Sequence, residues 1–321
     1  MNIDQLQDTI NACRFCFMCR HLSPVGNVTF READTPRGRA LLAGKLQQDI
    51  KSFNPDYVET FYRAELSAAC RCHCVSHYDE AGLILAARRD LVDAGLTPEP
   101  VKKLAAELQQ VDFKVEGSGE VLYYVDLYST KARAPKGCKT ISGGDAGKAL
   151  EVLGFVREAD AVFTKFQAAV KDSGCKTVVT SDPAEYDFLK ARLPSVKVLH
   201  SSEFLEGKKG TGTVYYLDSD YLKNYQKKMT APQDLLKRLG YTLKPFGTNT
   251  EESYTAGEGA VIYDRLYPEL TAKMCERIAG LADDPAADVL VTSSPYTKFV
   301  LSKYTPQLKV LLLDEIATEG I

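Results

Sequence analysis

The sequence predicts an α + α/β protein in which an all-helical N-terminal region precedes two tandem α/β domains. Helical periodicity without β-rich alternation runs through residues 1–115, and short β-branched and aromatic runs then alternate with helix-length segments. A motif that occurs twice in the second part indicates two copies of one domain type. The length of 321 residues corresponds to about two domains of roughly 150 residues, and the duplication divides the second part again. We expect domains at residues 1–116, 120–206 and 212–321.

The helical region contains several amphipathic stretches with recognisable ends. Thr35 is a favourable N-cap, and Pro36 suits the first position of the helix that continues through Leu46. Gly95 follows another stretch and is a typical helix terminator. Beside the helix that starts at Thr35, we expect helices over residues 4–11, 57–69, 81–94 and 101–111.

The α/β part is an internal repeat. Residues 179–183 (Val-Thr-Ser-Asp-Pro) match residues 291–295 (Val-Thr-Ser-Ser-Pro), and the same offset relates the strand-like segments that follow. Residues 121–126 match residues 213–218 at a shorter offset. Because helix-length segments separate these runs, we expect parallel sheets. The predicted strands are residues 121–128, 177–180, 196–200, 213–218, 289–292 and 308–313.

Composition excludes several classes of function. Forty Lys and Arg residues against 43 Asp and Glu residues give a net charge of −3, which argues against nucleic acid as a partner. No apolar run reaches the roughly 20 residues that a membrane-spanning helix needs, and residues 1–5 lack the features of a secretory signal. We expect a cytoplasmic protein that associates with a membrane only through a partner.

The nine cysteines are the most informative residues, because six of them are clustered. The clustered residues are Cys13, Cys16, Cys19, Cys70, Cys72 and Cys74. An odd total without a signal peptide argues against a disulfide framework, and the close spacing favours a metal site. The other three, Cys138, Cys175 and Cys275, are expected to be small core residues.

The first cluster has the C-x2-C-x2-C spacing that begins the bacterial ferredoxin pattern, in which a fourth cysteine, followed by proline, ligates the other cluster. Here that place holds Ser23-Pro24. If Cys74 is the fourth cysteine of a second run, the first three positions of that run are Ala64, Ser67 and Cys70. One ligand set is then complete: Cys13, Cys16, Cys19 and Cys74. The other set, Ala64, Ser67, Cys70 and Ser23, has one thiol, so we expect a single [4Fe–4S] cluster.

Other interpretations of the cysteines remain open. A tetrahedral zinc site could use Cys13, Cys16, Cys72 and Cys74, or recruit His73 or His77. Cys70 and Cys72 are secondary candidates as metal ligands, or as a pair for thiol–disulfide chemistry, although a C-x-C disulfide is strained. The neighbouring Arg14, Phe15, Phe17, Arg20 and His21 either raise the potential of a cluster or form a solvated or partner-facing surface.

Residues 13–24, the helix start Thr35-Pro36-Arg37-Gly38-Arg39 and the Cys74 region together resemble a known family. It comprises the iron–sulfur subunits of flavin-linked oxidoreductases, such as those of glycolate oxidase, anaerobic glycerol-3-phosphate dehydrogenase and heterodisulfide-reductase-like proteins. The resemblance implies an α-helical ferredoxin-like domain followed by two cysteine-rich "CCG" domains. It further implies an electron-transfer subunit that relays single electrons between a flavoprotein partner and another carrier. We expect no flavin and no catalytic residue on this chain.

This chain departs from the family pattern, because the cysteines of both CCG domains are missing. Where the family has cysteines in its CCG domains, this chain has Ser181-Asp182-Pro183, Ser293-Ser294-Pro295, Ile141-Ser142-Gly143-Gly144 and Tyr254-Thr255-Ala256-Gly257. Oxygen ligands hold iron–sulfur clusters poorly, so both CCG-type domains are degenerate. Asp182 and Glu185, near Asp126, either bind a hard cation or are polar loop residues. The alternative function is a structural or assembly subunit with a structural iron–sulfur or zinc site.

Overall fold

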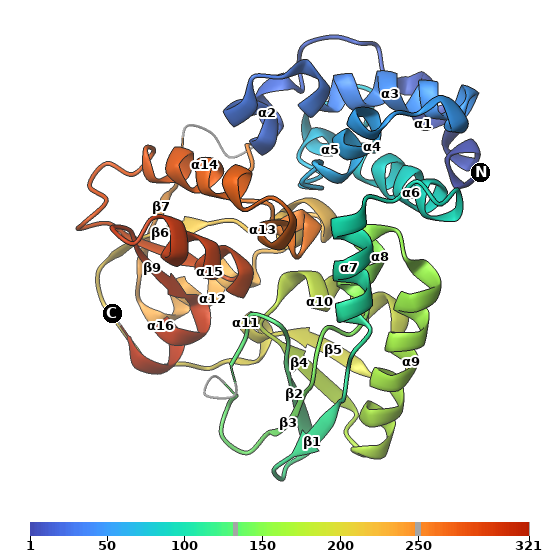
Figure 1. Cartoon of the computed structure of the whole chain (residues 1–321). Coiled ribbons are helices and arrows are strands. Elements are labelled where there is room, and N and C mark those ends of the chain that lie inside the picture. The colour runs from blue at the N-terminus through green and yellow to red at the C-terminus, as the bar shows by residue number, and fades with distance from the viewer. Residues whose placement is uncertain (131–133, 248–251, 321) are drawn as a thin grey trace.

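The computed structural model describes residues 1–130, 134–247 and 252–320. A helical region comes first and lies across one end of two α/β units, each of which contains its own sheet (Figure 1). The predicted mixture of a helical part and an α/β part is confirmed at this level.

The helical region is built from short helices joined by tight turns. The Thr35 hydroxyl caps the third α-helix by accepting a hydrogen bond from the Gly38 N–H at 3.2 Å, as the sequence predicts. The α-helices are α1 (Gln7–Ala12), α2 (Pro24–Thr29), α3 (Pro36–Gln48), α4 (Pro55–Tyr62), α5 (Cys70–His73), α6 (Glu80–Asp93) and α7 (Glu99–Leu108), with 3-10 turns at Asn2–Leu6, Arg20–Leu22, Glu32–Asp34 and Ile50–Ser52.

The helix predicted over residues 57–69 is wrong in its second half. α4 ends at Tyr62, and Leu66 and Ala68 have left-handed backbone conformations with φ of +55°. The carbonyl groups of the segment are bound by side chains from distant parts of the chain. The Tyr225 hydroxyl donates to the Leu66 carbonyl, and the Asn224 amide donates to the Ser67 carbonyl. Tertiary hydrogen bonds thus replace those of the expected helix.

The first sheet has the strand order β1-β3-β2-β4-β5. β1 pairs antiparallel with β3 at the edge, and the remaining neighbours are parallel. Its strands are β1 (Lys114–Glu116), β2 (Val121–Val125), β3 (Lys139–Ser142), β4 (Thr177–Thr180) and β5 (Lys197–His200), and its helices are α8 (Lys148–Leu153), α9 (Val156–Asp172), α10 (Pro183–Arg192) and α11 (Ser201–Phe204).

The second sheet has the order β7-β6-β8-β9, with every neighbour parallel. This order is equivalent to β3-β2-β4-β5, so the two sheets share one topology. Its strands are β6 (Thr213–Leu217), β7 (Thr242–Pro245), β8 (Val289–Thr292) and β9 (Lys309–Leu312). Its helices are α12 (Ala231–Leu239), α13 (Tyr263–Leu266), α14 (Pro268–Ala279), α15 (Pro295–Tyr304) and α16 (Leu313–Glu319), with shorter turns at Tyr221–Tyr225 and Glu258–Ala260.

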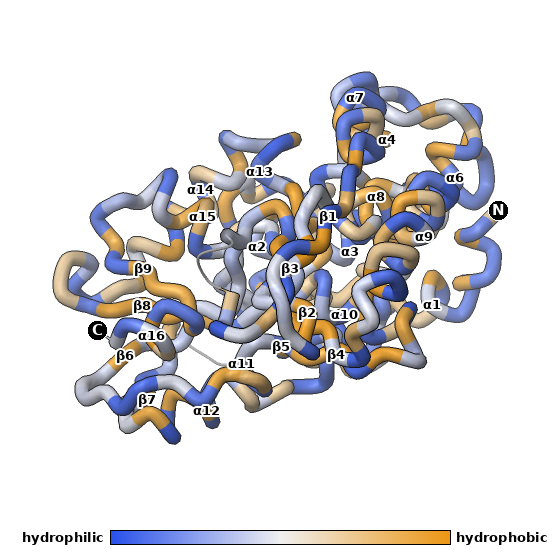
Figure 2. Tube along the Cα trace, turned by 90° about the horizontal axis from the view of Figure 1, so that it is seen from below, coloured by the Kyte–Doolittle hydropathy of each residue, from blue (hydrophilic) through white to orange (hydrophobic). Residues whose placement is uncertain are grey.

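All six predicted strands are present, as β2, β4, β5, β6, β8 and β9, whereas β1, β3 and β7 were not predicted. The three additional strands lie at or next to a sheet edge and bury few side chains. β1 is exposed throughout, β3 buries only Ile141, and β7 ends in a proline. Strands of this kind lack the apolar alternation that identifies a strand. Figure 2 shows hydrophobic stretches along β2 and β4, which the sequence did reveal.

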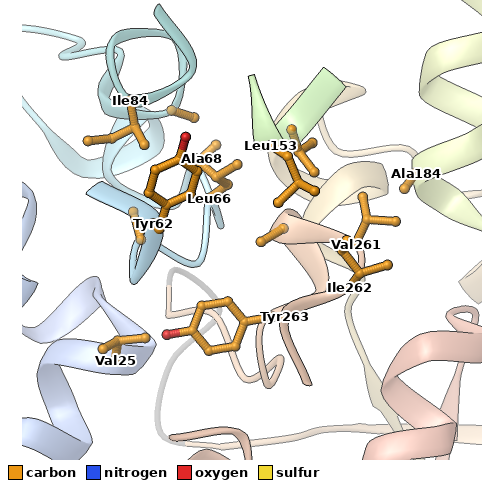
Figure 3. Close-up of a cluster of buried hydrophobic side chains, with 14 of the residues drawn as sticks. Val25, Tyr62, Leu66, Ala68, Ile84, Leu153, Ala184, Val261, Ile262 and Tyr263 are labelled. Atoms are coloured by element: carbon orange, nitrogen blue, oxygen red, sulfur yellow. The ribbon is translucent and has the colours of Figure 1, made fainter. Parts of the chain in front are cut away.

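One hydrophobic core connects the helical region to both α/β units. Figure 3 shows Tyr62 and Leu66 from the helical region near Leu153 from α8 and Val261 and Tyr263 from the second unit. These five side chains are all nearly inaccessible to solvent. Among the described residues, none of the helices combines the length and the apolar character that crossing a bilayer requires.

A close backbone approach in this core gives the first testable prediction. A Cβ atom added at Gly259 would lie 2.1 Å from the carbonyl oxygen of Leu66, so Gly259→Ala forces the two segments apart. We expect the substitution to lower the free energy of unfolding by about 1–3 kcal/mol in urea titrations. The control is Gly280→Ala, where the nearest atom is 3.5 Å away and no loss is expected. Equal stability of the two variants would contradict this packing.

Candidate metal centre

Three of the predicted ligands lie on one loop between two helices. Cys13 directly follows α1, and Cys19 directly precedes the 3-10 turn Arg20–Leu22. The backbone turns at Phe15, whose φ of +52° lies in the left-handed region that residues other than glycine seldom adopt. The loop that carries the three cysteines is therefore compact.

Cys74 is positioned by the end of a different helix. The Cys74 N–H donates to the Cys70 carbonyl at 2.8 Å, which closes the single turn of α5. The chain then turns again at His77, whose φ is +49° and whose N–H donates to the Cys74 carbonyl. Local backbone hydrogen bonds on both sides therefore determine where Cys74 lies.

The two segments meet, and all four first-choice cysteines line one small recess. The side chains of Cys13, Cys19 and Cys74 are half-buried, whereas Cys16 is exposed, so the recess lies at the protein surface. Its other lining residues are Arg14, Phe15, Met18, Val75, Ser76 and Tyr78. The structure thus brings together residues that are more than fifty positions apart in the chain.

The two secondary candidates point elsewhere. Cys70 is buried, and its thiol lies 3.5 Å from the Tyr78 carbonyl and 3.9 Å from a carboxylate oxygen of Glu80. The Cys72 thiol lies 3.7 Å from the amide oxygen of Asn224 in the second α/β unit. Neither lines the recess, so the zinc set that includes Cys72 is not assembled in this structure.

The four thiols offer the donor type that an iron–sulfur cluster requires. Soft sulfur ligands are the ones that hold such clusters, and four of them line this recess. Within the described ranges, no three His, Cys, Asp or Glu side chains gather closely enough to hold a metal ion. The fit to a [4Fe–4S] cluster therefore rests on the chemistry of the donors.

Burial disfavours the ionised form of two of these thiols, Cys13 and Cys19. Burial raises the pKa of Cys13, and burial together with the Glu80 carboxylate raises the pKa of Cys19 to about 11. The thiolate is the form that binds metals. Ligation at this site therefore releases protons, and positive charge in the recess is needed to hold the thiolate form at neutral pH.

The region around Ser23 and Cys70, where a second cluster would require ligands, is filled by a buried ionic network. Ser23 is buried, and its hydroxyl donates to a Glu65 carboxylate oxygen at 3.1 Å. The other Glu65 oxygen lies 3.6 Å from the Arg39 guanidinium, which also pairs with Glu80. Glu80 in turn contacts the Cys70 thiol. We call Arg39, Glu65 and Glu80 the ionic network. These three side chains therefore lie between Ser23 and Cys70, two positions of the incomplete second ligand set.

Sequence reasoning did not identify the ionic network. Arg39 is fully buried, and Glu65 and Glu80 are each less than 4% exposed. A charged residue within an apolar stretch, such as Glu65 between Ala64 and Leu66, is the signal that could have indicated a buried pair.

In the first α/β unit, Asp182 and Asp126 bind nearby backbone N–H groups, whereas Glu185 accepts hydrogen bonds from the Ala146 N–H and the Tyr124 hydroxyl. Asp182 caps α10 by accepting hydrogen bonds from Ala184 N–H and Glu185 N–H at 2.8 and 2.9 Å. Asp126 accepts hydrogen bonds from the Tyr128 and Ser129 N–H groups. These bonds favour the interpretation as polar loop residues.

The second α/β unit has a corresponding polar group at the end of β6. The Asp220 carboxylate accepts hydrogen bonds from the hydroxyls of Ser253 and Thr255, and burial raises its pKa to about 6. Thr255 belongs to residues 254–257, which align with a CCG position of the family that the sequence resembles. Protein oxygen atoms therefore meet here, at a place where the family pattern would have a thiolate.

Comparison of the chain with protein-family models, curated proteins and solved structures gave no significant match. The family resemblance therefore rests on the sequence motifs, and function has to be argued from the site.

Removing the cation from the ionic network tests its contribution to stability. Arg39→Met leaves Glu65 and Glu80 buried without their partner, and we expect a loss of about 3–5 kcal/mol in the free energy of unfolding. Lys45→Met is the matched control, because Lys45 is exposed on the same helix. A loss in Arg39→Met no larger than in the control would contradict a stabilising role for the pairing.

The ionic network also predicts a pH dependence. Burial raises the pKa of Glu65 to about 7, so between pH 5 and pH 7 the folded protein holds a proton that the unfolded chain releases. The contribution of Glu65 to the free energy of unfolding is therefore fully present below the pKa of the unfolded state. It is lost as the pH rises through the pKa of the folded state. Glu65→Gln should flatten the decline in urea midpoint over this interval, whereas Glu99→Gln, at an exposed position, should not. Parallel profiles for wild type and Glu65→Gln would refute the assignment.

Proposed function

We propose that this protein is an electron-transfer subunit that holds one [4Fe–4S] cluster on Cys13, Cys16, Cys19 and Cys74. The observation that carries the proposal is the recess that these four side chains line together. When bound, such a cluster accepts and releases one electron at a time. The partners are a flavoprotein oxidoreductase subunit, which carries the flavin and the substrate chemistry, and a second electron carrier.

Two features support a single cluster over several. The ionic network fills the space beside Ser23 and Cys70 with the protein's own charged side chains. In the α/β units, the places that correspond to family thiolates hold hydroxyl and carboxylate groups bonded to one another or to backbone. In this proposal the α/β units support the helical region and contact the partner.

In this proposal the residues around the recess ligate the cluster, shield it from water or set its charge environment. The four cysteines supply thiolates, and the side chains of Phe15, Met18 and Val75 limit access of water. The Arg37 guanidinium lies 4.2 Å from the centre of the Phe17 ring, and its charge favours the thiolate of Cys13. Positive charge beside an anionic cluster raises its reduction potential.

A structural or assembly role is the second candidate, and one observation favours it. Residues 66–72 contact the second α/β unit at three points. The Tyr225 hydroxyl donates to the Leu66 carbonyl, the Asn224 amide donates to the Ser67 carbonyl, and the Cys72 thiol lies 3.7 Å from the Asn224 amide oxygen. A metal centre that orders this segment would stabilise the junction without any electron relay. Under either function, we propose a cytoplasmic location, with contact to a membrane only through the partner.

Metal analysis of protein purified without oxygen separates these functions. We expect about four irons and four sulfides per chain with a broad visible absorption that dithionite bleaches. Stoichiometric zinc without iron would refute the electron-transfer function, and about eight irons would refute the single cluster. A full cluster that dithionite and stronger reductants leave unreduced would favour the structural role.

Two serine variants test the ligand set. Cys74→Ser removes a thiolate from the recess, and we expect most of the iron and the visible absorption to be lost. Cys72→Ser is the matched control, since it changes the same atom two residues away, outside the recess. A wild-type iron content in Cys74→Ser, or its loss in Cys72→Ser, would show that the four ligands are wrongly assigned.

A further inference from the structure

Exposed hydrophobic side chains gather around the recess. Phe15, Phe17, Met18 and Val75 are 46%, 63%, 49% and 74% exposed, and three of them line the recess. Single exposed apolar residues are ordinary on protein surfaces, but adjacent ones mark interaction sites. We name this surface, formed by residues 14–21 and 71–77, the recess face.

The recess face carries positive charge on a chain whose net charge is −3. Arg14 and Arg20 are exposed, and neither forms an ion pair within the described part of the chain. Arg71 is paired with Asp79 at 2.6 Å. Three of the four histidines, His21, His73 and His77, also belong to this face, which contains no Asp or Glu.

We propose that the recess face is the docking surface for an acidic partner protein that exchanges electrons with the centre in the recess. This inference rests on the proposed electron-transfer function and specifies where, and to what kind of surface, the partner binds. An apolar patch on the partner covers Phe15, Phe17 and Val75, while carboxylates around it face Arg14 and Arg20. Charge of opposite sign accelerates encounter and orients the two proteins.

The position of Cys16 places a partner that docks on this face next to the proposed cluster. Cys16 is the exposed member of the ligand set and lies between Phe15 and Phe17. A partner that covers these aromatic side chains therefore comes directly against a ligand of the centre. Electron-transfer encounters commonly bury less than about 1,200 Å², an area that suits a patch of a few side chains.

An anionic membrane surface is the rival occupant, and the charges favour it less. Segments that bind anionic lipid headgroups typically have clusters of about 4–8 Lys or Arg residues. The recess face has no lysine, and of its three arginines only Arg71 pairs with a carboxylate among the residues that the structure describes. The surface therefore matches a protein with a few well-placed carboxylates.

The experiment measures reduction of the loaded protein by an acidic flavodoxin in its hydroquinone state. Each flavodoxin hydroquinone becomes a semiquinone, and the electron reduces one oxidised cluster, which stopped-flow absorbance follows. We expect the second-order rate constant to fall with added salt. At low salt, Arg14→Glu/Arg20→Glu should be slower than wild type by about tenfold or more. Phe17→Ser should be slower at every salt concentration.

Matched controls place equivalent changes on other surfaces. Lys102→Glu/Lys165→Glu reverses two exposed charges on α7 and α9, and Phe299→Ser removes an exposed aromatic ring on α15. Both should react within about twofold of wild type at about 0.1 M salt, because the field of a distant charge is then screened beyond about 10 Å. Iron content and the dithionite-reduced spectrum should be unchanged in all variants.

The outcomes distinguish this inference from the proposed function. Protein that lacks iron refutes the function itself, before any rate is measured. A loaded, reducible cluster whose reaction with flavodoxin is insensitive to salt and to the recess-face variants overturns the docking surface alone. Sedimentation with phosphatidylglycerol vesicles that Arg14→Glu/Arg20→Glu abolishes, without a matching effect on the flavodoxin reaction, assigns the face to a membrane and also overturns it.

Discussion

The carbonyl groups of residues 61–67 are the point at which the three parts of the chain are joined. The Arg88 guanidinium donates to the carbonyls of Phe61, Tyr62 and Ala64 and also to that of Val152 in α8. Side chains of the second α/β unit bind the next carbonyls: Tyr263 binds Arg63, Tyr225 binds Leu66, and Asn224 binds Ser67. A buried carbonyl without a partner costs about 1–3 kcal/mol. Separating the second α/β unit from the helical region would break three of these hydrogen bonds, and separating the first unit would break the bond to Val152.

Two buried arginines organise the helical region in different ways. Arg88 is fully buried, and burial lowers its pKa. Its guanidinium donates to four carbonyl oxygens, and those of Phe61, Tyr62 and Ala64 present negative dipole ends where α4 terminates. Arg39 instead pairs with the carboxylates of Glu65 and Glu80. The guanidinium group suits both tasks because it holds five N–H donors in one plane. A lysine at position 88 would supply at most three donors from a single atom. The junction thus depends on the geometry of the guanidinium as well as on its charge.

Much of the fold and of the candidate site could be predicted because the signals are local. Buried central strands show as apolar runs, and Thr35-Pro36 shows as a helix start. The four cysteines that line the recess follow from spacing along the chain. The end of α4 at Tyr62 could not be predicted, because it depends on hydrogen bonds from residues about 160 positions away. The edge strands bury too little to be recognised, and the ionic network depends on tertiary contacts among Arg39, Glu65 and Glu80.

The second α/β unit takes part in positioning the candidate centre although it contributes no ligand. Asn224 and Tyr225 hold the segment at Leu66 and Ser67, and Gly259 permits its close approach. This segment leads directly into α5, and α5 ends at Cys74. Packing that begins in the second unit therefore contributes to the place of Cys74 relative to the loop of Cys13–Cys19, beside the local hydrogen bonds from the Cys74 N–H to the Cys70 carbonyl and from the His77 N–H to the Cys74 carbonyl. Contacts from a distant unit and the turn of α5 together hold this segment in place.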